Sequence, residues 1–135
     1  MSRKFKEYFK SRAKVGLSIS CLGQNTMTTI LVCLLIATLM PILAKIPLTI
    51  AMNKEQGGYD NRHPRAQQKH LTGFGARAVA AHANCFEALI LFVPGALAVI
   101  ITQSAGHLAE YSAMLFIVAR IGYLCAYWSN VHLVR

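Results

Sequence analysis

One uncharged stretch of the chain constrains its fold more than any other feature. Between Asn25 and Ala44 there is no charged side chain, and the centre of the stretch is almost entirely aliphatic. A helix needs about 20 predominantly apolar residues to cross the hydrocarbon core of a bilayer. This stretch therefore predicts a membrane-spanning α-helix.

The composition of the chain also favours a membrane location. Charged residues make up 14% of the 135 residues, whereas an ordinary soluble domain has about 25%. Hydrophobic residues make up 55% of the chain, and the mean hydropathy is +0.43. A single domain of this size cannot bury so many apolar side chains in its own core, so the remainder must face lipid.

Two further apolar segments follow the first one. We expect helices at about 27–52, 76–102 and 108–129, and a polar loop rich in glycine over 53–75. Pro41 and Pro47 fall inside the first helix, where a membrane bundle tolerates them because neighbouring groups satisfy the freed backbone. The predicted fold class is an all-α, multi-pass membrane bundle.

The N-terminal segment, residues 1–26, is predicted to be a basic tail. Six Lys and Arg side chains and only one acidic residue, Glu7, occur in its first 14 positions, and the net charge of the chain is +9. Nucleic-acid binding is one interpretation of such a tail. The apolar chain behind it favours a juxtamembrane segment that attracts anionic lipid, so no nucleic-acid partner is expected.

The cysteines do not predict a metal site or a disulfide framework. Cys21, Cys33, Cys85 and Cys125 have no metal-ligand spacing, and most of them lie inside apolar segments. They are interpreted as small residues embedded in the membrane.

The second predicted helix carries a polar stripe. At 100° per residue, Arg77 and Asn84 lie about 20° apart, and Asn84 and Glu87 lie about 60° apart. These three side chains therefore share one face of the helix, whereas His82 lies about 160° from Asn84. Ionisable groups inside a membrane helix are costly and usually face a bundle interior or a wet cavity, so they are candidates for a functional site.

The third predicted helix carries a matching stripe. Arg120, Tyr123 and Tyr127 share a face because they are spaced by three, four and seven positions. Two interpretations remain open at this point. In the first, Glu87 pairs with Arg120 and the polar groups only hold the helices together. In the second, the two stripes form a pocket for a charged ligand.

Three stretches resemble the MAPEG family, the membrane-associated proteins of eicosanoid and glutathione metabolism. Residues 81–87 (AHANCFE) are similar to the helix 2 signature of the family. Residues 119–127 (ARIGYLCAY) are similar to the helix 3 signature, an Arg followed by Tyr at +3 and +7. Residues 58–65 (GYDNRHPR) look like the loop of the bacterial branch. The resemblance covers residues 27–135.

The resemblance implies a fold and an activity. The family folds as a membrane helical bundle that assembles as a homotrimer, with glutathione bound between subunits. Its members act as glutathione transferases, peroxidases or eicosanoid synthases on lipophilic electrophiles or hydroperoxides. For this chain we expect glutathione as co-substrate and a location in the bacterial inner membrane.

The chemistry of glutathione suits the polar stripes. Its carboxylates favour the bidentate fork of arginine, and its ammonium favours a carboxylate. Its thiol needs a nearby cation or hydrogen-bond donor that stabilises the thiolate. By resemblance, the expected glutathione-binding residues are Arg77, His82, Asn84, Glu87, Arg120 and Tyr123, and the expected catalytic residues are Arg135 and Tyr127.

The chain departs from the family pattern in three places. Ala80 stands where the eukaryotic members have an Arg, four residues before the motif Asn. The eukaryotic spacing would put the thiolate-stabilising Arg at Val134, whereas the bacterial spacing puts it at Arg135. A fourth membrane helix is expected of the family and is not visible in this sequence. The alternative to an enzyme is therefore a degenerate or truncated, non-catalytic member with a structural or binding role.

Overall fold

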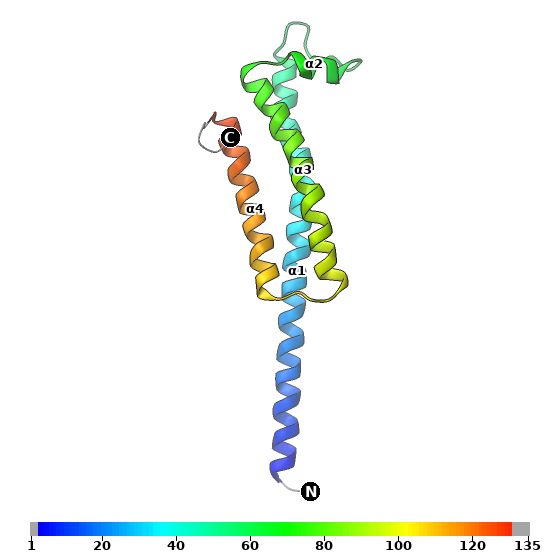
Figure 1. Cartoon of the computed structure of the whole chain (residues 1–135), viewed down its shortest axis with the longest axis vertical. Coiled ribbons are helices and arrows are strands. Elements are labelled where there is room, and N and C mark those ends of the chain that lie inside the picture. Colours follow the sequence, from blue (N-terminus) through cyan, green and yellow to red (C-terminus); the bar gives the residue numbers. More distant parts are fainter. Residues whose placement is uncertain (1–2, 131–135) are drawn as a thin grey trace.

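The computed structural model describes the backbone of residues 3–130, together with the side chains of Glu7 and of residues 25–130. All regular structure in this part of the chain is helical, as the sequence predicted. Figure 1 shows α3 and α4 lying beside the C-terminal half of α1, with α2 at one end of the bundle. The helices are α1 (Arg3–Asn53), α2 (Pro64–His70), α3 (Gly73–Ile101) and α4 (His107–Trp128).

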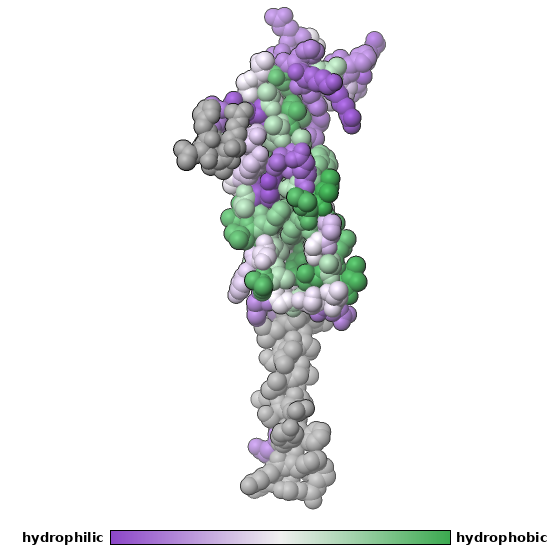
Figure 2. All heavy atoms as spheres, in the orientation of Figure 1, coloured by the Kyte–Doolittle hydropathy of each residue, from purple (hydrophilic) through white to green (hydrophobic). Residues whose placement is uncertain are grey.

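Three segments are long and apolar enough to cross a bilayer: Asn25–Asn53, Gly73–Ile101 and His107–Trp128. Large apolar side chains cover the outside of the bundle, as the hydrophobic surface in Figure 2 shows. Leu91 is 80% exposed and Leu108 is 82% exposed. Apolar surface of this extent is unfavourable in water and favourable against lipid. The fold is therefore a membrane helical bundle.

The helix boundaries differ in detail from those expected. α3 begins at Gly73 instead of residue 76, and its entry is a turn in which Gly73 has φ +54°. The backbone of the N-terminal tail is helical from Arg3 and continuous with α1. The polar loop contains a short helix, α2, that was not expected. Pro64 stands at its first turn, where the fixed φ of proline favours helix initiation.

Small side chains set the packing of α1 against α3. Ala44 of α1 and both Ala78 and Ala81 of α3 are completely buried. Small residues let two membrane helices approach closely, which increases van der Waals contact along the crossing. Towards the polar loop, larger side chains take over, and Leu48 and Met52 are also fully buried. This packing fixes the face that α3 turns towards α4.

Glu110 connects α4 to α1 at the opposite end of the bundle. Its Oε1 accepts a hydrogen bond from the Oγ1 of Thr29 at 2.9 Å, and its Oε2 accepts one from the Oγ1 of Thr26 at 3.4 Å. Nδ1 of His107 lies 3.3 Å from the same Oε2. Glu110 also stands in the first turn of α4, where the helix dipole favours an anion. This contact holds the start of α4 against α1.

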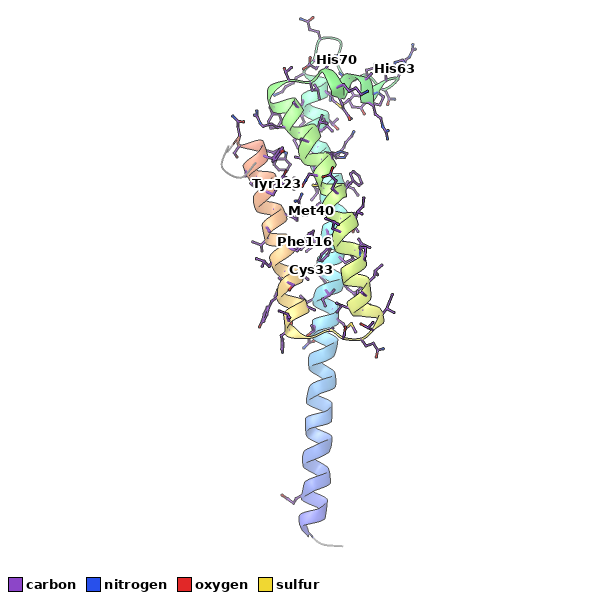
Figure 3. All side chains as sticks on the ribbon, in the orientation of Figure 1. Cys33, Met40, His63, His70, Phe116 and Tyr123 are labelled. Atoms are coloured by element: carbon purple, nitrogen blue, oxygen red, sulfur yellow. The ribbon has the colours of Figure 1, made fainter. Side chains whose placement is uncertain are left out.

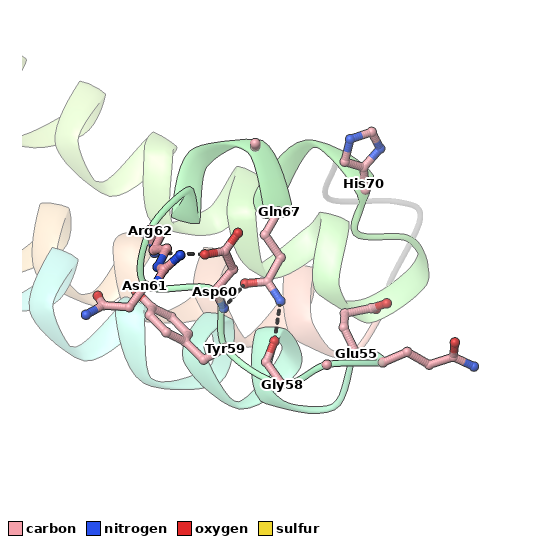
Figure 4. A pocket seen from close by; sticks show the side chains of 11 residues that line it. Glu55, Gly58, Tyr59, Asp60, Asn61, Arg62, Gln67 and His70 are labelled. Carbon is pink, nitrogen blue, oxygen red and sulfur yellow. Dashed lines mark hydrogen bonds between the residues drawn. The ribbon is translucent and has the colours of Figure 1, made fainter.

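The polar loop is organised around Gln67. Its Nε2 donates to the carbonyl oxygens of Gly58 at 2.7 Å and Met52 at 3.1 Å, and its Oε1 accepts the N–H of Asp60 at 3.0 Å. Figure 4 shows the contacts of Gln67 with Gly58 and Asp60. These residues line an open hollow of about 760 Å³. The amide of Gln67 thereby ties the loop to the end of α1.

Asp60 is expected to make the loop sensitive to acid. The backbone N–H groups of His63 and Arg62 donate to its carboxylate at 2.9 and 2.8 Å, which lowers the pKa of Asp60. Because the pKa of Asp60 is lower in the folded state, its carboxylate stabilises the loop at pH values above the pKa of the unfolded state, about 3.9. This stabilisation is lost as the pH falls through the pKa of the folded state. Amide hydrogen exchange over residues 61–70, corrected for intrinsic rates, should therefore accelerate below about pH 4.

Asp60→Asn is the matched control for this prediction. Its Oδ1 keeps the ability to accept both N–H groups, but it does not titrate. The corrected exchange of the variant should stay constant over the same pH range. If the wild-type loop keeps its protection through the acid range, the carboxylate does not hold it.

Candidate functional site

The two polar stripes meet at Arg120 and Asn84. The Nη2 of Arg120, on α4, donates to the backbone oxygen of Asn84 at 3.3 Å and to its side-chain Oδ1. The Nδ2 of Asn84 in turn donates to the Oε2 of Glu87 at 3.3 Å. Asn84 therefore stands between the cation and the carboxylate, and a hydrogen-bonded network (Arg120, Asn84, Glu87) joins α4 to α3.

Two tyrosines extend this network along α4. The guanidinium carbon of Arg120 lies 4.6 Å from the centroid of the Tyr123 ring, a cation–π distance. The rings of Tyr123 and Tyr127 follow with centroids 4.8 Å apart. Figure 3 shows Tyr123 on the side of α4 that faces α1 and α3. The sequence stripe of α4 is thus one continuous polar and aromatic surface.

The network is open on one side. Arg120 and Asn84 are half-buried, whereas Glu87 is exposed. Figure 2 shows a hydrophilic patch between the hydrophobic surfaces of α3 and α4, at mid-height of the bundle. A carboxylate exposed at this depth is costly unless a partner or water covers it. A polar ligand, a second subunit, or both could therefore bind at the exposed side of the network.

Arg77 lies apart from the network on the same helix. It is seven positions before Asn84, which corresponds to about 10 Å along the helix axis. Its guanidinium lies 5.9 Å from the centroid of the Phe74 ring, and its buried Nε has no hydrogen-bond partner. Arg77 therefore keeps hydrogen-bonding capacity that the described part of the chain does not use.

The other expected site residues do not join the network. His82 makes an edge-to-face contact with Phe86, with ring centroids 5.2 Å apart, on a different side of α3. Arg135 lies outside the described residues. Within the described residues, no group of three potential metal ligands lies together.

The space inside the subunit next to Arg120 is small. A cavity of about 10 Å³ is lined by Arg120, Cys85 and Met40 together with apolar side chains. That volume is close to the minimum for one water molecule. A larger polar ligand would therefore lie against the open face of the network, not inside this cavity.

Fold and site together define the class of the protein: a multi-pass membrane bundle with a polar network between two of its helices. The comparison with protein families makes this more specific. The MAPEG family model matches residues 29–135, and the chain belongs to the MAPEG family. No curated protein and no solved structure matches the chain. The resemblance found in the sequence motifs is therefore confirmed at the level of the family.

Proposed function

We propose that this protein is a membrane-embedded, glutathione-dependent transferase or peroxidase of the bacterial MAPEG branch, similar to the microsomal glutathione transferases. The observation that carries the proposal is the network of Arg120, Asn84 and Glu87, which offers a cation, an amide and a carboxylate on one open face. Family membership supports glutathione as the ligand, because the family as a whole is associated with it.

The spacing of the polar groups along α3 suits a tripeptide. Three extended residues span roughly 10 Å, and the same distance, about 10 Å, separates Arg77 from Asn84 along the helix. The γ-glutamyl end of glutathione carries an ammonium for Glu87 and a carboxylate for Arg120. The glycine carboxylate at the other end would reach Arg77, whose Nε is unpaired.

A homotrimer would complete such a site. Glu87 of the network is exposed in its own subunit, and the cavity beside Arg120 is too small for glutathione. A neighbouring copy packed against this side would cover the exposed carboxylate of Glu87 and exclude water. Water exclusion strengthens each charged contact to the ligand.

The reaction would start from the glutathione thiolate, with Arg135 and Tyr127 proposed as the groups that stabilise it. In conjugation, sulfur forms a bond to the electrophilic carbon and the leaving group departs with the bonding electrons. With a hydroperoxide, sulfur attacks the terminal oxygen, the O–O bond breaks, and the alcohol leaves. The resulting sulfenic acid and a second glutathione give the disulfide and water.

The alternative is a non-catalytic binding or structural member of the family. Ala80 favours it, because this exposed position, one turn before Asn84, offers no cation to the ligand. Such a protein would bind glutathione or lipid without turnover. Conjugation of an aryl halide and reduction of a lipid hydroperoxide, measured on the intact oligomer in lipid nanodiscs, separate the two functions.

A comparison of two ligands tests the pocket directly. Wild-type protein in nanodiscs should bind glutathione at least about tenfold more tightly than N-acetylglutathione, which lacks the ammonium that Glu87 is proposed to pair with. In Glu87→Gln this preference should disappear, because the carboxylate is gone while the shape is kept. Isothermal titration calorimetry measures all four affinities. A preference that persists in the variant would place the ammonium elsewhere.

A further inference from the structure

α1 is longer than the membrane that it crosses. The whole helix is Arg3–Asn53, whereas its candidate membrane span is Asn25–Asn53. The remaining part, residues 3–24, is called the α1 extension and is about 33 Å long at 1.5 Å per residue. Figure 1 shows it continuing beyond the ends of α3 and α4. Ile101 and Leu108 have exposed apolar side chains at that end of the bundle, so the lipid-facing surface reaches this level and the extension begins where the membrane ends.

One face of the α1 extension is apolar. At 100° per residue, six aliphatic or aromatic positions fall within an arc of about 140°: Phe5, Tyr8, Phe9, Val15, Ile19 and Leu22. We call this arc the apolar stripe. A helix face of this width normally packs against protein or lipid, because apolar surface is unfavourable in water.

The apolar stripe continues the buried face of α1. The same spacing of three and four residues leads from Leu22 into positions that are buried in the bundle: Thr26, Ile30, Cys33, Ala37 and Met40. In the bundle α3 and α4 cover this face of α1, whereas the extension runs past the ends of both helices (Figure 1). The stripe therefore continues beyond the two helices that cover it.

The opposite face of the α1 extension is basic. Arg3, Lys6, Lys10 and Lys14 fall within an arc of about 80°, and its centre is about 170° from the centre of the apolar stripe. Glu7 is the only acidic residue of the extension. Helices that lie in the interface of an anionic membrane have this pattern of apolar and basic faces. We propose that the α1 extension binds the surface of an anionic bilayer as a helix lying in the plane of the membrane.

Lying flat brings the charges of the extension to the lipid headgroups. In a straight continuation of α1, Lys10 is 15 positions before Asn25 and therefore about 22 Å beyond it. The Debye length at physiological ionic strength is about 8 Å, so cations at that height hardly interact with the membrane surface. A helix in the plane of the membrane keeps all its cations within this distance and removes the apolar stripe from water.

Gly23 provides the place for the bend. It directly precedes the membrane span, and it lies on the apolar stripe, where the missing Cβ leaves room on the inner side of a bend. A bend towards the side of the stripe turns the stripe to the bilayer and the basic face away from it. The direction of the bend that uses Gly23 therefore also gives the helix its correct orientation on the membrane.

A second copy of the chain fits the apolar stripe less well. Positions 5, 8, 12, 15, 19 and 22 match the spacing of a coiled-coil seam, but one of them is Arg12. A trimeric seam would bury three guanidinium groups, and Glu7 lies about 140° away from Arg12 on the helix and does not pair with it. At a membrane surface, the long stem of an arginine lets its charge reach the lipid phosphates. Arg12 therefore favours anionic lipid over a coiled coil.

Fluorescence from the two faces of the extension tests the proposal. In full-length protein, an environment-sensitive fluorescent amino acid replaces Phe9 in one variant and Glu7, about 160° away, in another. In nanodiscs with about one third phosphatidylglycerol, emission at position 9 should lie at least about 15 nm to the blue of its value in phosphatidylcholine, and emission at position 7 should shift by less than about 5 nm. Raising the salt concentration from about 0.1 M to about 1 M should at least halve the shift, because the Debye length falls to about 3 Å.

Charge variants separate binding by the extension from a general attraction of the basic chain. The triple variant Lys6→Gln, Lys10→Gln, Lys14→Gln should reduce the shift at position 9 at least about fourfold. The matched control should keep the shift, because it removes three exposed cations from the polar loop instead: Lys54→Gln, Arg62→Gln and Lys69→Gln. Equal losses in the two triple variants would contradict binding by the extension.

Three further results would overturn the proposal. An aqueous environment at position 9 in anionic nanodiscs would mean that the extension projects into water. A blue emission at position 9 that is equal in both lipids and insensitive to salt would mean that the stripe packs against protein, as in a coiled coil of copies. A shift that requires added duplex DNA and not anionic lipid would mean that the extension binds nucleic acid.

Discussion

Replacing Arg120 by leucine is expected to weaken glutathione binding by about a hundredfold, the loss of two charge-assisted hydrogen bonds. Arg120 supplies the cation of the network and also fixes Asn84 through two hydrogen bonds. Without it, the ligand would lose a direct partner and the amide that orients Glu87. Calorimetry on the variant in nanodiscs measures the affinity, and kcat/KM should fall in parallel.

The stability of the same variant distinguishes a binding role from a structural one. Removing Arg120 leaves the side-chain Oδ1 of Asn84 without its donor, which costs about 1–3 kcal/mol. It also removes a charge from the middle of a membrane helix, which is worth a similar amount, about 2.5–3.5 kcal/mol on insertion scales. The two effects oppose each other, so the melting temperature should change little. A large loss of stability with unchanged glutathione affinity would mean that Arg120 only holds the helices together.

Arg120→Lys and Arg62→Leu serve as controls. Lysine keeps the charge but lacks the planar fork, so its affinity should fall between those of the wild type and Arg120→Leu. Arg62 lies in the polar loop and its side chain is exposed, so its removal tests the effect of lowering the net charge alone. If both arginine-to-leucine variants weaken binding equally, the effect is a general electrostatic one.

The sequence predicted the helices well because hydropathy and length carry that information directly. The uncharged stretch from Asn25 and the apolar segments after the loop became the three candidate spans. It also predicted that the stripe of α3 and the stripe of α4 contain partners. It predicted a direct contact of Glu87 with Arg120 as one possibility, whereas the structure connects them through Asn84. Helical periodicity gives the face of each residue but not which neighbour it reaches.

Other features gave weaker signals or none. The contact of Glu110 with another helix could have been predicted, because Glu110 is an ionisable residue at the start of an apolar helix and such residues need partners. The start of α2 could also have been predicted, because Pro64 follows polar turn residues and proline favours the first turn of a helix. The hollow of about 410 Å³ between α1, α3 and α4, lined by Phe92, Phe116 and other mostly apolar side chains, could not be predicted, because these residues resemble ordinary membrane-facing surface. A hollow depends on how three helices diverge, and periodicity does not encode that.

Replacing Ala81 by leucine is expected to be the most destabilising of these changes. Ala81 packs in a cluster with Ala44 of α1, and both side chains are fully buried. Three added carbon atoms have no space at a crossing that depends on small side chains, so α1 and α3 must separate or rotate. We expect a loss of about 3 kcal/mol in the free energy of unfolding. Thermal unfolding in detergent and in nanodiscs, followed by circular dichroism, measures it.

Ala83→Leu is the control for this substitution, because Ala83 is exposed two positions further along α3. The same increase in volume there should change the free energy of unfolding by less than about 0.5 kcal/mol. In Ala81→Leu the rotation of α3 should also move Asn84 away from Arg120, so glutathione affinity should fall together with stability. An unchanged unfolding transition in Ala81→Leu would mean that α1 and α3 do not cross closely at this position. In that case the network between α3 and α4 could not be positioned by the alanine contacts described above.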